Sequence, residues 1–246
     1  MRLGKLPVRH DPRTLQLKHY SSTELPPPPA FWRGASVVEW PMYANDRYQC
    51  CTCAAAGHMV HDWTSIRHNT QLVSEAEVLG SYLLLTEGDV ERGVAMLDTL
   101  RHWRSRGIGN HQIHSYVALD AHSPEQLRGA ISLFGSAYIG LELPNFAMAD
   151  VDRRKIPWVL PPGGPVGDAA PNTDNGHCVA AIGYDEANIY VVTWGYLKTL
   201  TWDFYQAYNE EAYAVLSPDW LDEAKDGHER FNVKTLERDL ALVSRD

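Results

Sequence analysis

The apolar pattern of this 246-residue chain changes from a helical to a strand-like period near its midpoint. In the first half, small and apolar residues from Cys51 to Ile66 follow the i, i+3, i+4, i+7 spacing of a helix with one buried face. Ser74 and Glu77 form a capping-box signature for a second helix, and Asp89 begins a third helical segment. The first half is therefore expected to be helical.

The second half contains short apolar runs bounded by turn residues, which are typical of strands. The predicted strands are Ala137 to Leu143, Cys178 to Tyr184, Ile189 to Trp194 and Ala212 to Leu216, followed by a charged helix from about Val233 to Leu242. Helices first and strands later favour an α+β fold.

Composition restricts the class of protein. With 44% hydrophobic residues the chain can bury a large core without disulfides. A net charge of -9 leaves no broad basic face, so nucleic acid is not expected as a partner. The chain shows no apolar run long enough to span a membrane and no readable export signal, and three of its four cysteines lie within four residues. A cytoplasmic location without a membrane partner is expected, and the oligomeric state stays open.

The first 40 residues are expected to form an extended arm. The run Pro26 to Pro29 favours polyproline II structure, and Phe31, Trp32, Val37 and Val38 suggest that the arm is anchored by packing. It lacks the long amphipathic helix of an inhibitory pro-segment. The predicted organisation is an arm (1–40), a helical lobe that contains Cys51 (41–120), a β lobe that contains His177 (121–217) and a helical tail (218–246).

Cys51 and His177 supply the two groups needed to make and use a thiolate nucleophile. A free thiol is mostly protonated at neutral pH, but a helix N-terminus and a nearby imidazolium both favour the thiolate. His177 could later protonate the leaving group, and the backbone N–H of Cys51 with the Asn45 amide could bind an oxyanion. The residues predict acyl transfer from a peptide or protein substrate, with no metal or organic cofactor.

This pattern resembles the papain-like cysteine peptidases. In that family an amide residue stands six positions before the nucleophile, as Asn45 stands before Cys51. The family's base begins a strand reading His-Ala-Val-Ala-Ala-Val-Gly-Tyr, and the strand from His177 reads His-Cys-Val-Ala-Ala-Ile-Gly-Tyr. Thr193 stands sixteen positions after His177, where the family has the residue that orients the base. The segment from Asn45 to Thr52 is also similar to bacterial and phage papain-like proteins.

The resemblance implies a helical lobe and an antiparallel β lobe with the active site in a cleft between them. It assigns catalytic roles to Cys51, His177, Thr193 and Asn45. Thr193 replaces an asparagine and Asn45 a longer glutamine, so a catalytically weak binding or structural module is the alternative. Cys53 is a second candidate nucleophile, although the residue six positions before it is Arg47.

A zinc site is the other alternative for the cysteine-rich segment. Cys50, Cys51, Cys53, His58 and His61 are suitable ligand types, but adjacent cysteines at a helix start point in different directions and no second pair of ligands is evident. The preferred interpretation makes the other cysteines, Cys178 included, small core residues. It places the two histidines on a helix face near solvent.

Overall fold

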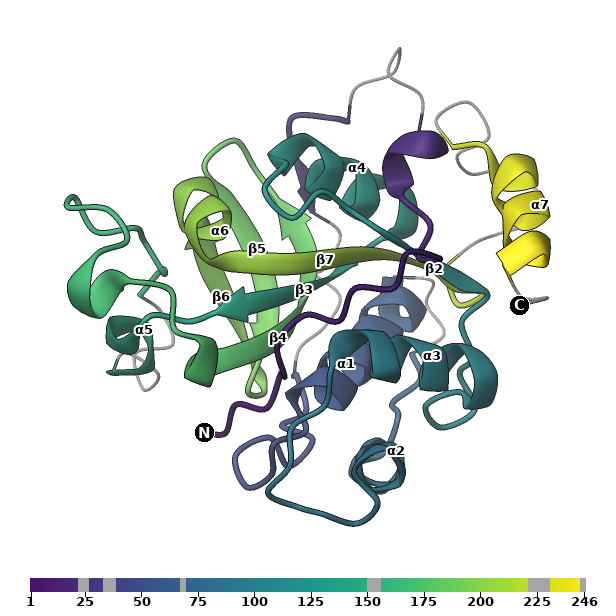
Figure 1. Ribbon diagram of the computed structural model, residues 1–246, viewed down its shortest axis with the longest axis horizontal. Coiled ribbons are helices and arrows are strands. Elements are labelled where there is room, and N and C mark those ends of the chain that lie inside the picture. Colours follow the sequence, from purple (N-terminus) through teal and green to yellow (C-terminus); the bar gives the residue numbers. More distant parts are fainter. Residues whose placement is uncertain (22–26, 33–38, 67–69, 150–155, 221–230, 244–246) are drawn as a thin grey trace.

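The computed structural model describes residues 1–21, 27–32, 39–66, 70–149, 156–220 and 231–243 (Figure 1). Val37 and Val38, which were expected to help anchor the arm, lie outside these ranges, as does part of the predicted tail. None of the helices within these ranges is both long and apolar enough to cross a membrane.

Helices and strands form two groups in space, with α1, α2 and α3 on one side and β3 to β6 on the other (Figure 1). The helices are α1 (Cys51–Ile66), α2 (Glu75–Thr86), α3 (Met96–Arg106), α4 (Pro124–Phe134), α5 (Asn145–Ala149), α6 (Trp202–Tyr208) and α7 (Val233–Val243), with 3-10 turns η1 (Leu17–His19), η3 (Gly167–Ala169) and η4 (Thr173–Asn175). The strands are β1 (Phe31–Trp32), β2 (Ser115–Ala118), β3 (Ala137–Glu142), β4 (Gly176–Tyr184), β5 (Asn188–Thr193), β6 (Tyr196–Thr201) and β7 (Asn209–Leu216).

The strands form one sheet in the order β2-β7-β3-β4-β5-β6, with β1 paired to β4. All pairs of these strands are antiparallel, which confirms the predicted α+β class. The short strands β2 and β6 and the helices α5 and α6 were not predicted, because segments of four to seven residues carry little periodic signal.

Helix α1 is buried on all sides, so the prediction of one buried face was wrong. Of its 16 residues, all except Ile66 are buried. Its run of small residues lets neighbouring segments approach closely: a Cβ on Gly57 would lie 2.9 Å from the Tyr43 ring. His58 and His61 are consequently buried among Trp40 and Tyr43 and do not face solvent.

Helix α2 has the predicted capping box. The Ser74 hydroxyl accepts from the Glu77 backbone N–H, and the Glu77 carboxylate accepts from the Ser74 backbone N–H. Helix α3 begins at Met96, seven residues after the predicted start at Asp89. The residues between α2 and α3 instead form a loop that the Tyr82 hydroxyl holds through the carbonyl oxygens of Val90 and Arg92. Tertiary contacts thus override the helical pattern there.

Buried contacts tie α1 to the sheet and to two other helices. The Tyr138 hydroxyl on β3 donates to the carbonyl oxygen of Thr52 in α1 at 2.8 Å. Trp63 of α1 stacks on Trp103 of α3 with ring centroids 5.8 Å apart, and its indole N–H donates to the Phe134 carbonyl oxygen. The Tyr138 contact holds the start of α1 against the middle of the sheet, and the Trp63 contacts hold its last turn against α3 and α4.

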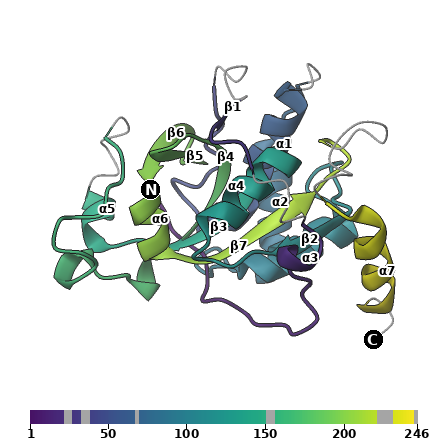
Figure 2. The same ribbon diagram turned by 90° about the horizontal axis from the view of Figure 1, so that it is seen from above.

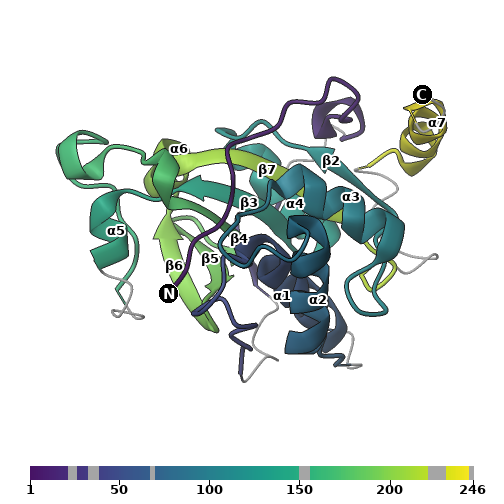
Figure 3. The ribbon, with the colours of Figure 1, turned by 60° about the horizontal axis from the view of Figure 1, so that its bottom comes forward.

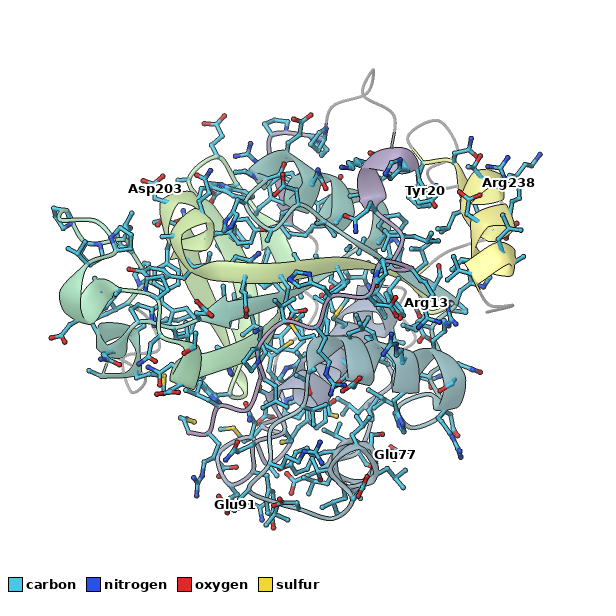
Figure 4. The ribbon with its side chains drawn as sticks, in the orientation of Figure 1. Arg13, Tyr20, Glu77, Glu91, Asp203 and Arg238 are labelled. Carbon is cyan, nitrogen blue, oxygen red and sulfur yellow. The ribbon has the colours of Figure 1, made fainter. Side chains whose placement is uncertain are left out.

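The N-terminal arm lies partly inside the molecule. Residues 1–8 run in extended form across the junction of the helices with the strands, as Figures 1 and 3 both show (purple). Farther along, Tyr20 lies beside α7, where its hydroxyl donates to Asp239 (Figure 4). Figure 2 shows the arm continuing along the outside of β7 and β2 between these two places. The first residues of the chain therefore lie between the helices and the strands.

Candidate active site

Cys51 is the first residue of α1, as predicted. A tight turn precedes the helix, with left-handed backbone at Tyr43 (φ 51°) and Ala44 (φ 57°) and a hydrogen bond from Asn45 N–H to the Met42 carbonyl oxygen. This turn places Asn45 beside the helix start. The position at a helix N-terminus favours a negative charge on the Cys51 sulfur.

His177 and Thr193 meet across neighbouring strands. His177 is the second residue of β4 and Thr193 is the last of β5, and their Nε2 and Oγ1 atoms are 2.6 Å apart. The other ring nitrogen of His177, Nδ1, is buried and has no hydrogen-bond partner within the described part of the chain. A hydrogen bond at Nε2 leaves Nδ1 as the nitrogen available for chemistry.

Trp194 covers the imidazole of His177. Trp194 (φ 45°) and Gly195 (φ 73°) form a two-residue turn with positive φ at both positions between β5 and β6. The turn stacks the indole on the His177 ring, with centroids 4.3 Å apart and planes 15° from parallel. Stacking excludes water from the bond between His177 and Thr193, which strengthens that bond.

The cleft holds a peptide, namely the chain's own residues 1–8. The carbonyl oxygen of Arg2 accepts from the Asn45 side-chain amide at 3.3 Å and from the Trp194 indole N–H at 3.0 Å. The backbone N–H groups of Gly4 and Lys5 both donate to the Gly176 carbonyl oxygen, at 3.1 and 3.0 Å. The segment therefore passes directly over the residue that precedes His177.

The opposite wall of the cleft is the loop between α2 and α3. Val94 N–H donates to the Gly4 carbonyl oxygen at 2.8 Å, and Leu6 N–H donates to the Val94 carbonyl oxygen at 3.2 Å. Glycines line the cleft where the segment passes closest. A Cβ on Gly93 would collide with the Gly4 carbonyl oxygen, and a Cβ on Gly176 would collide with the Lys5 carbonyl oxygen. The cleft is therefore shaped for an extended backbone.

Cys51 lies against this segment and against β4. Its pKa is raised to about 11, mainly by burial, and the backbone N–H groups of Cys178, Thr52 and Lys5 act in the opposite direction by favouring the thiolate. The Cys51 sulfur thus faces the backbone of the residue that follows His177. The structure places the helix start, the histidine strand and the arm at one point.

Burial keeps both candidate catalytic groups neutral in this closed arrangement. Cys51 is 1% exposed, and His177 is fully buried. The pKa of His177 is lowered to about 3, first by burial and then by the nearby His58. The thiolate-imidazolium pair expected from the sequence is therefore not charged while residues 1–8 fill the cleft.

Cys53, the second candidate nucleophile, occupies a different environment. It is fully buried with its pKa raised to about 12, and its side-chain contacts are with Thr52 and Thr99. Cys50 donates to the Tyr43 carbonyl oxygen, and Cys178 is buried, as expected of core cysteines. His58 bonds the Pro41 carbonyl oxygen at 2.7 Å. Among the residues described, no three or more metal-ligating side chains form a group suited to a metal ion.

The structure adds residues that sequence reasoning did not find. Lys5, Gly93 and Gly176 take part in the closed cleft, together with Glu210 and Glu211, which contact the Lys5 ammonium group. Their sequence signal is weak, because single glycines and an acidic pair at a strand start occur in proteins of every fold. Only the folded chain shows that they converge.

Solved structures of known proteins share this fold. Xylellain, a cysteine protease from Xylella fastidiosa, aligns over 87% of this chain and 95% of its own, with a TM-score of 0.66 and 12% identity. The cysteine protease and lectin-like domains of Cwp84 from Clostridium difficile align over 88% of this chain and 57% of that one, with a TM-score of 0.62 and 12% identity.

The Carica candamarcensis cysteine protease CMS1MS2 aligns over 77% of this chain and 98% of its own, with a TM-score of 0.52 and 15% identity. No protein-family model matches the sequence, and no curated protein matches it. The sequence is thus far removed from these proteins, while the arrangement of its helices and strands is shared with them. The chain has the fold of the papain-like cysteine proteases, as the Cys51 helix and the His177 strand predict.

Proposed function

We propose that this chain is a cysteine peptidase or related amide hydrolase with Cys51 as nucleophile and His177 as base. One observation carries the proposal: a peptide segment, residues 1–5, already lies extended across Cys51, bonded to Gly176 and to the Asn45 amide. A cleft that binds an extended backbone beside a thiol could present a peptide carbonyl to that thiol.

Asn45 supports an oxyanion role. Its Nδ2 atom donates to a peptide carbonyl oxygen, that of Arg2, so its shorter side chain does reach a carbonyl in the cleft. The backbone N–H of Cys51, at the start of α1, is the second proposed donor. Together they would stabilise the negative charge that develops on the substrate oxygen.

The reaction begins when a substrate replaces residues 1–8. Nδ1 of His177 takes the thiol proton, and the Cys51 sulfur adds to the carbonyl carbon. The imidazolium then gives its proton to the leaving amine as the C–N bond breaks, which leaves a thioester on Cys51. Water, deprotonated by His177, hydrolyses the thioester and restores the thiol. Thr193 orients the imidazole throughout.

A catalytically weak binding module is the second candidate. Its support is the filled cleft, with both Cys51 and His177 neutral, and a hydroxyl in place of an amide beside the histidine. Such a protein would bind extended peptides without cleaving them. The two candidates differ in the reactivity of Cys51 once the cleft opens.

The pH dependence of Cys51 alkylation by iodoacetamide distinguishes the two. In a peptidase, the open form reacts through an ion pair, so the rate of Cys51 modification should stay high below pH 7. Mass spectrometry of proteolytic peptides gives the rate at each cysteine. His177→Ala should return the profile to that of an ordinary thiol, with an apparent pKa of about 8.5.

Cys53→Ser is the matched control, since it removes the neighbouring buried thiol and should leave the Cys51 profile unchanged. If Cys51 reacts only as an ordinary thiol, with no difference between the unaltered chain and His177→Ala, the peptidase proposal is wrong and the binding module is favoured.

A further inference from the structure

Lys5 is a buried cation inside the cleft. It is 4% exposed, and its Nζ atom bonds to Oε2 of Glu210 and lies 3.4 Å from Oε1 of Glu211. The Glu211 side chain is itself only 5% exposed. Lysine is almost never buried unless it is paired, so a specific pocket receives this side chain.

A β-bulge builds the floor of the pocket. Gly140 of β3 pairs with Glu211 of β7, whereas the next residue, Leu141, pairs with Asn209, which leaves Glu210 as the extra residue. Regular alternation would send Glu210 and Glu211 to opposite faces of the sheet. The bulge lets both carboxylates reach one ammonium group.

The walls leave room for a long straight side chain. A Cβ on Gly140 would collide with Cε of Lys5, so glycine at this position keeps the pocket open. The same added Cβ would lie 2.9 Å from Glu211 Cγ, and the Met96 sulfur also borders this space. Narrow apolar walls above a carboxylate floor suit a methylene chain that ends in an ammonium group.

The pocket opens at the proposed reaction centre. The backbone N–H of Lys5 lies beside the Cys51 sulfur and donates to the carbonyl oxygen of Gly176, the neighbour of His177. Lys5 also pairs with Val94 on the opposite wall of the cleft. A peptide held by the same backbone groups would therefore place one of its side chains in the position of the Lys5 side chain.

Removal of Lys5 would leave the pocket with unbalanced negative charge. Glu211 Oε1 is buried and makes no hydrogen bond within the described residues, so the Lys5 ammonium is its nearest compensation. Glu142 is a further carboxylate close enough to interact with Lys5 and Glu210. A neutral side chain would leave these carboxylates unpaired, and an acidic one would be repelled.

We propose that the pocket floored by Glu210 and Glu211 is a subsite that selects a lysine side chain in a peptide substrate, with Lys5 as its occupant in the closed chain. The inference rests on the proposed function of Cys51. It adds a substrate class, namely peptides that carry lysine close to the bond to be cleaved.

Peptidyl vinyl sulfones test the subsite. In these probes the Cys51 thiolate adds to the vinyl carbon that is attached to the peptide, and a proton goes to the vinyl carbon beside the sulfone. Each modification adds the whole mass of the probe and is counted by intact mass. Probes that differ only in lysine, norleucine or glutamate, placed in turn at each side-chain position, are compared on the full-length chain. At one position the lysine probe should modify Cys51 roughly tenfold faster than the norleucine probe, and the glutamate probe should be slowest.

Two variants test whether the preference for lysine arises in this pocket. Lys5→Ala vacates the pocket, so all probes should react faster while lysine keeps its advantage. Glu211→Gln removes one buried charge, and the ratio of lysine to norleucine rates should fall by roughly fivefold or more. Glu186→Gln, in the exposed turn between β4 and β5, is the matched control and should leave the ratio unchanged.

The outcomes separate the two proposals. Equal rates for lysine and norleucine probes at every position, on a chain whose Cys51 is modified readily, overturn the lysine subsite and leave the peptidase proposal standing. A chain whose Cys51 resists iodoacetamide and every vinyl sulfone at all pH values overturns both. The comparison of probes on the unaltered chain needs no variant, so a folding defect in Glu211→Gln does not affect it.

Discussion

At the scale of single residues, the candidate site depends on how His177 is held. A hydroxyl orients an imidazole with one rotatable group, whereas an amide or carboxylate is more rigid. Here the Nε2 to Oγ1 distance of 2.6 Å and the stacked Trp194 ring restrict the imidazole from two directions. Under the proposed function, Thr193 would therefore serve where the resemblance implies an asparagine, with the stacked Trp194 ring as a second constraint on the imidazole.

Replacement of Thr193 tests this role. Thr193→Val keeps the shape but leaves the buried Nε2 of His177 without a partner, which should lower the free energy of unfolding by about 1–3 kcal/mol. It should also slow Cys51 alkylation below pH 7 more than above pH 9. Thr193→Ser, which keeps the hydroxyl, should retain the low-pH reactivity. Urea unfolding and alkylation rates provide the two readouts, and equal pH profiles for Val and Ser would contradict an orienting role.

At the scale of elements, the loop between α2 and α3 and the arm segment define the closed cleft together. Val94 exchanges backbone hydrogen bonds with Gly4 and Leu6, which is the pairing of a short strand. Because Gly93 has no side chain, the Gly4 carbonyl can approach it closely. The segment is held mainly by its backbone and by Lys5, so a small change in one wall should loosen it.

Gly93→Ala provides that change. The new Cβ would collide with the Gly4 carbonyl oxygen, so the segment should shift and the rate of Cys51 alkylation should rise by roughly tenfold, which corresponds to a loss of about 1.4 kcal/mol in closure. Gly80→Ala is the matched control, because nothing lies within 4 Å of its added Cβ on helix α2. Alanine has a higher helix propensity than glycine, so the Gly80→Ala control should be slightly more stable than the unaltered chain. Equal alkylation rates in both variants would show that residues 1–8 do not shield Cys51.

At the scale of the whole molecule, the candidate catalytic groups are buried between the helices and the sheet. His177 and His58 are both buried there, with their pKa values lowered to about 3 and about 4, chiefly by burial. Each must remain neutral in the closed fold. The stability of the closed fold is consequently linked to pH through groups at its centre.

Acid should destabilise the closed fold through His177. Its folded pKa of about 3 lies below the unfolded value of about 6.5, so the unfolded chain binds more protons between these values. The stability contribution is complete above pH 6.5 and is lost as pH falls towards 3. In urea titrations, the difference in unfolding free energy between the unaltered chain and His177→Gln should change by up to about 1.4 kcal/mol per pH unit between pH 6 and 4. A pH-independent difference would mean that His177 is not buried neutral.

Local sequence signals were enough to predict the α+β class, the helix that starts at Cys51, the capped helix α2 and the strand that begins near His177. These features depend on local periodicity, caps and a short motif, all of which are written in neighbouring residues. The same local signals were wrong for the start of α3 and for the exposure of His58 and His61, where packing between distant segments decides.

The occupant of the cleft, in contrast, is evident only in the folded chain. Residues 1–8 meet Val94, Gly176 and Glu211 across more than 80 positions of sequence, through backbone hydrogen bonds and one buried ion pair. Backbone pairing has almost no side-chain signature, and a lysine near an N-terminus is usually solvated. Burial, which raises the pKa of Cys51 and lowers that of His177, exists only when helices, sheet and arm close over the same point.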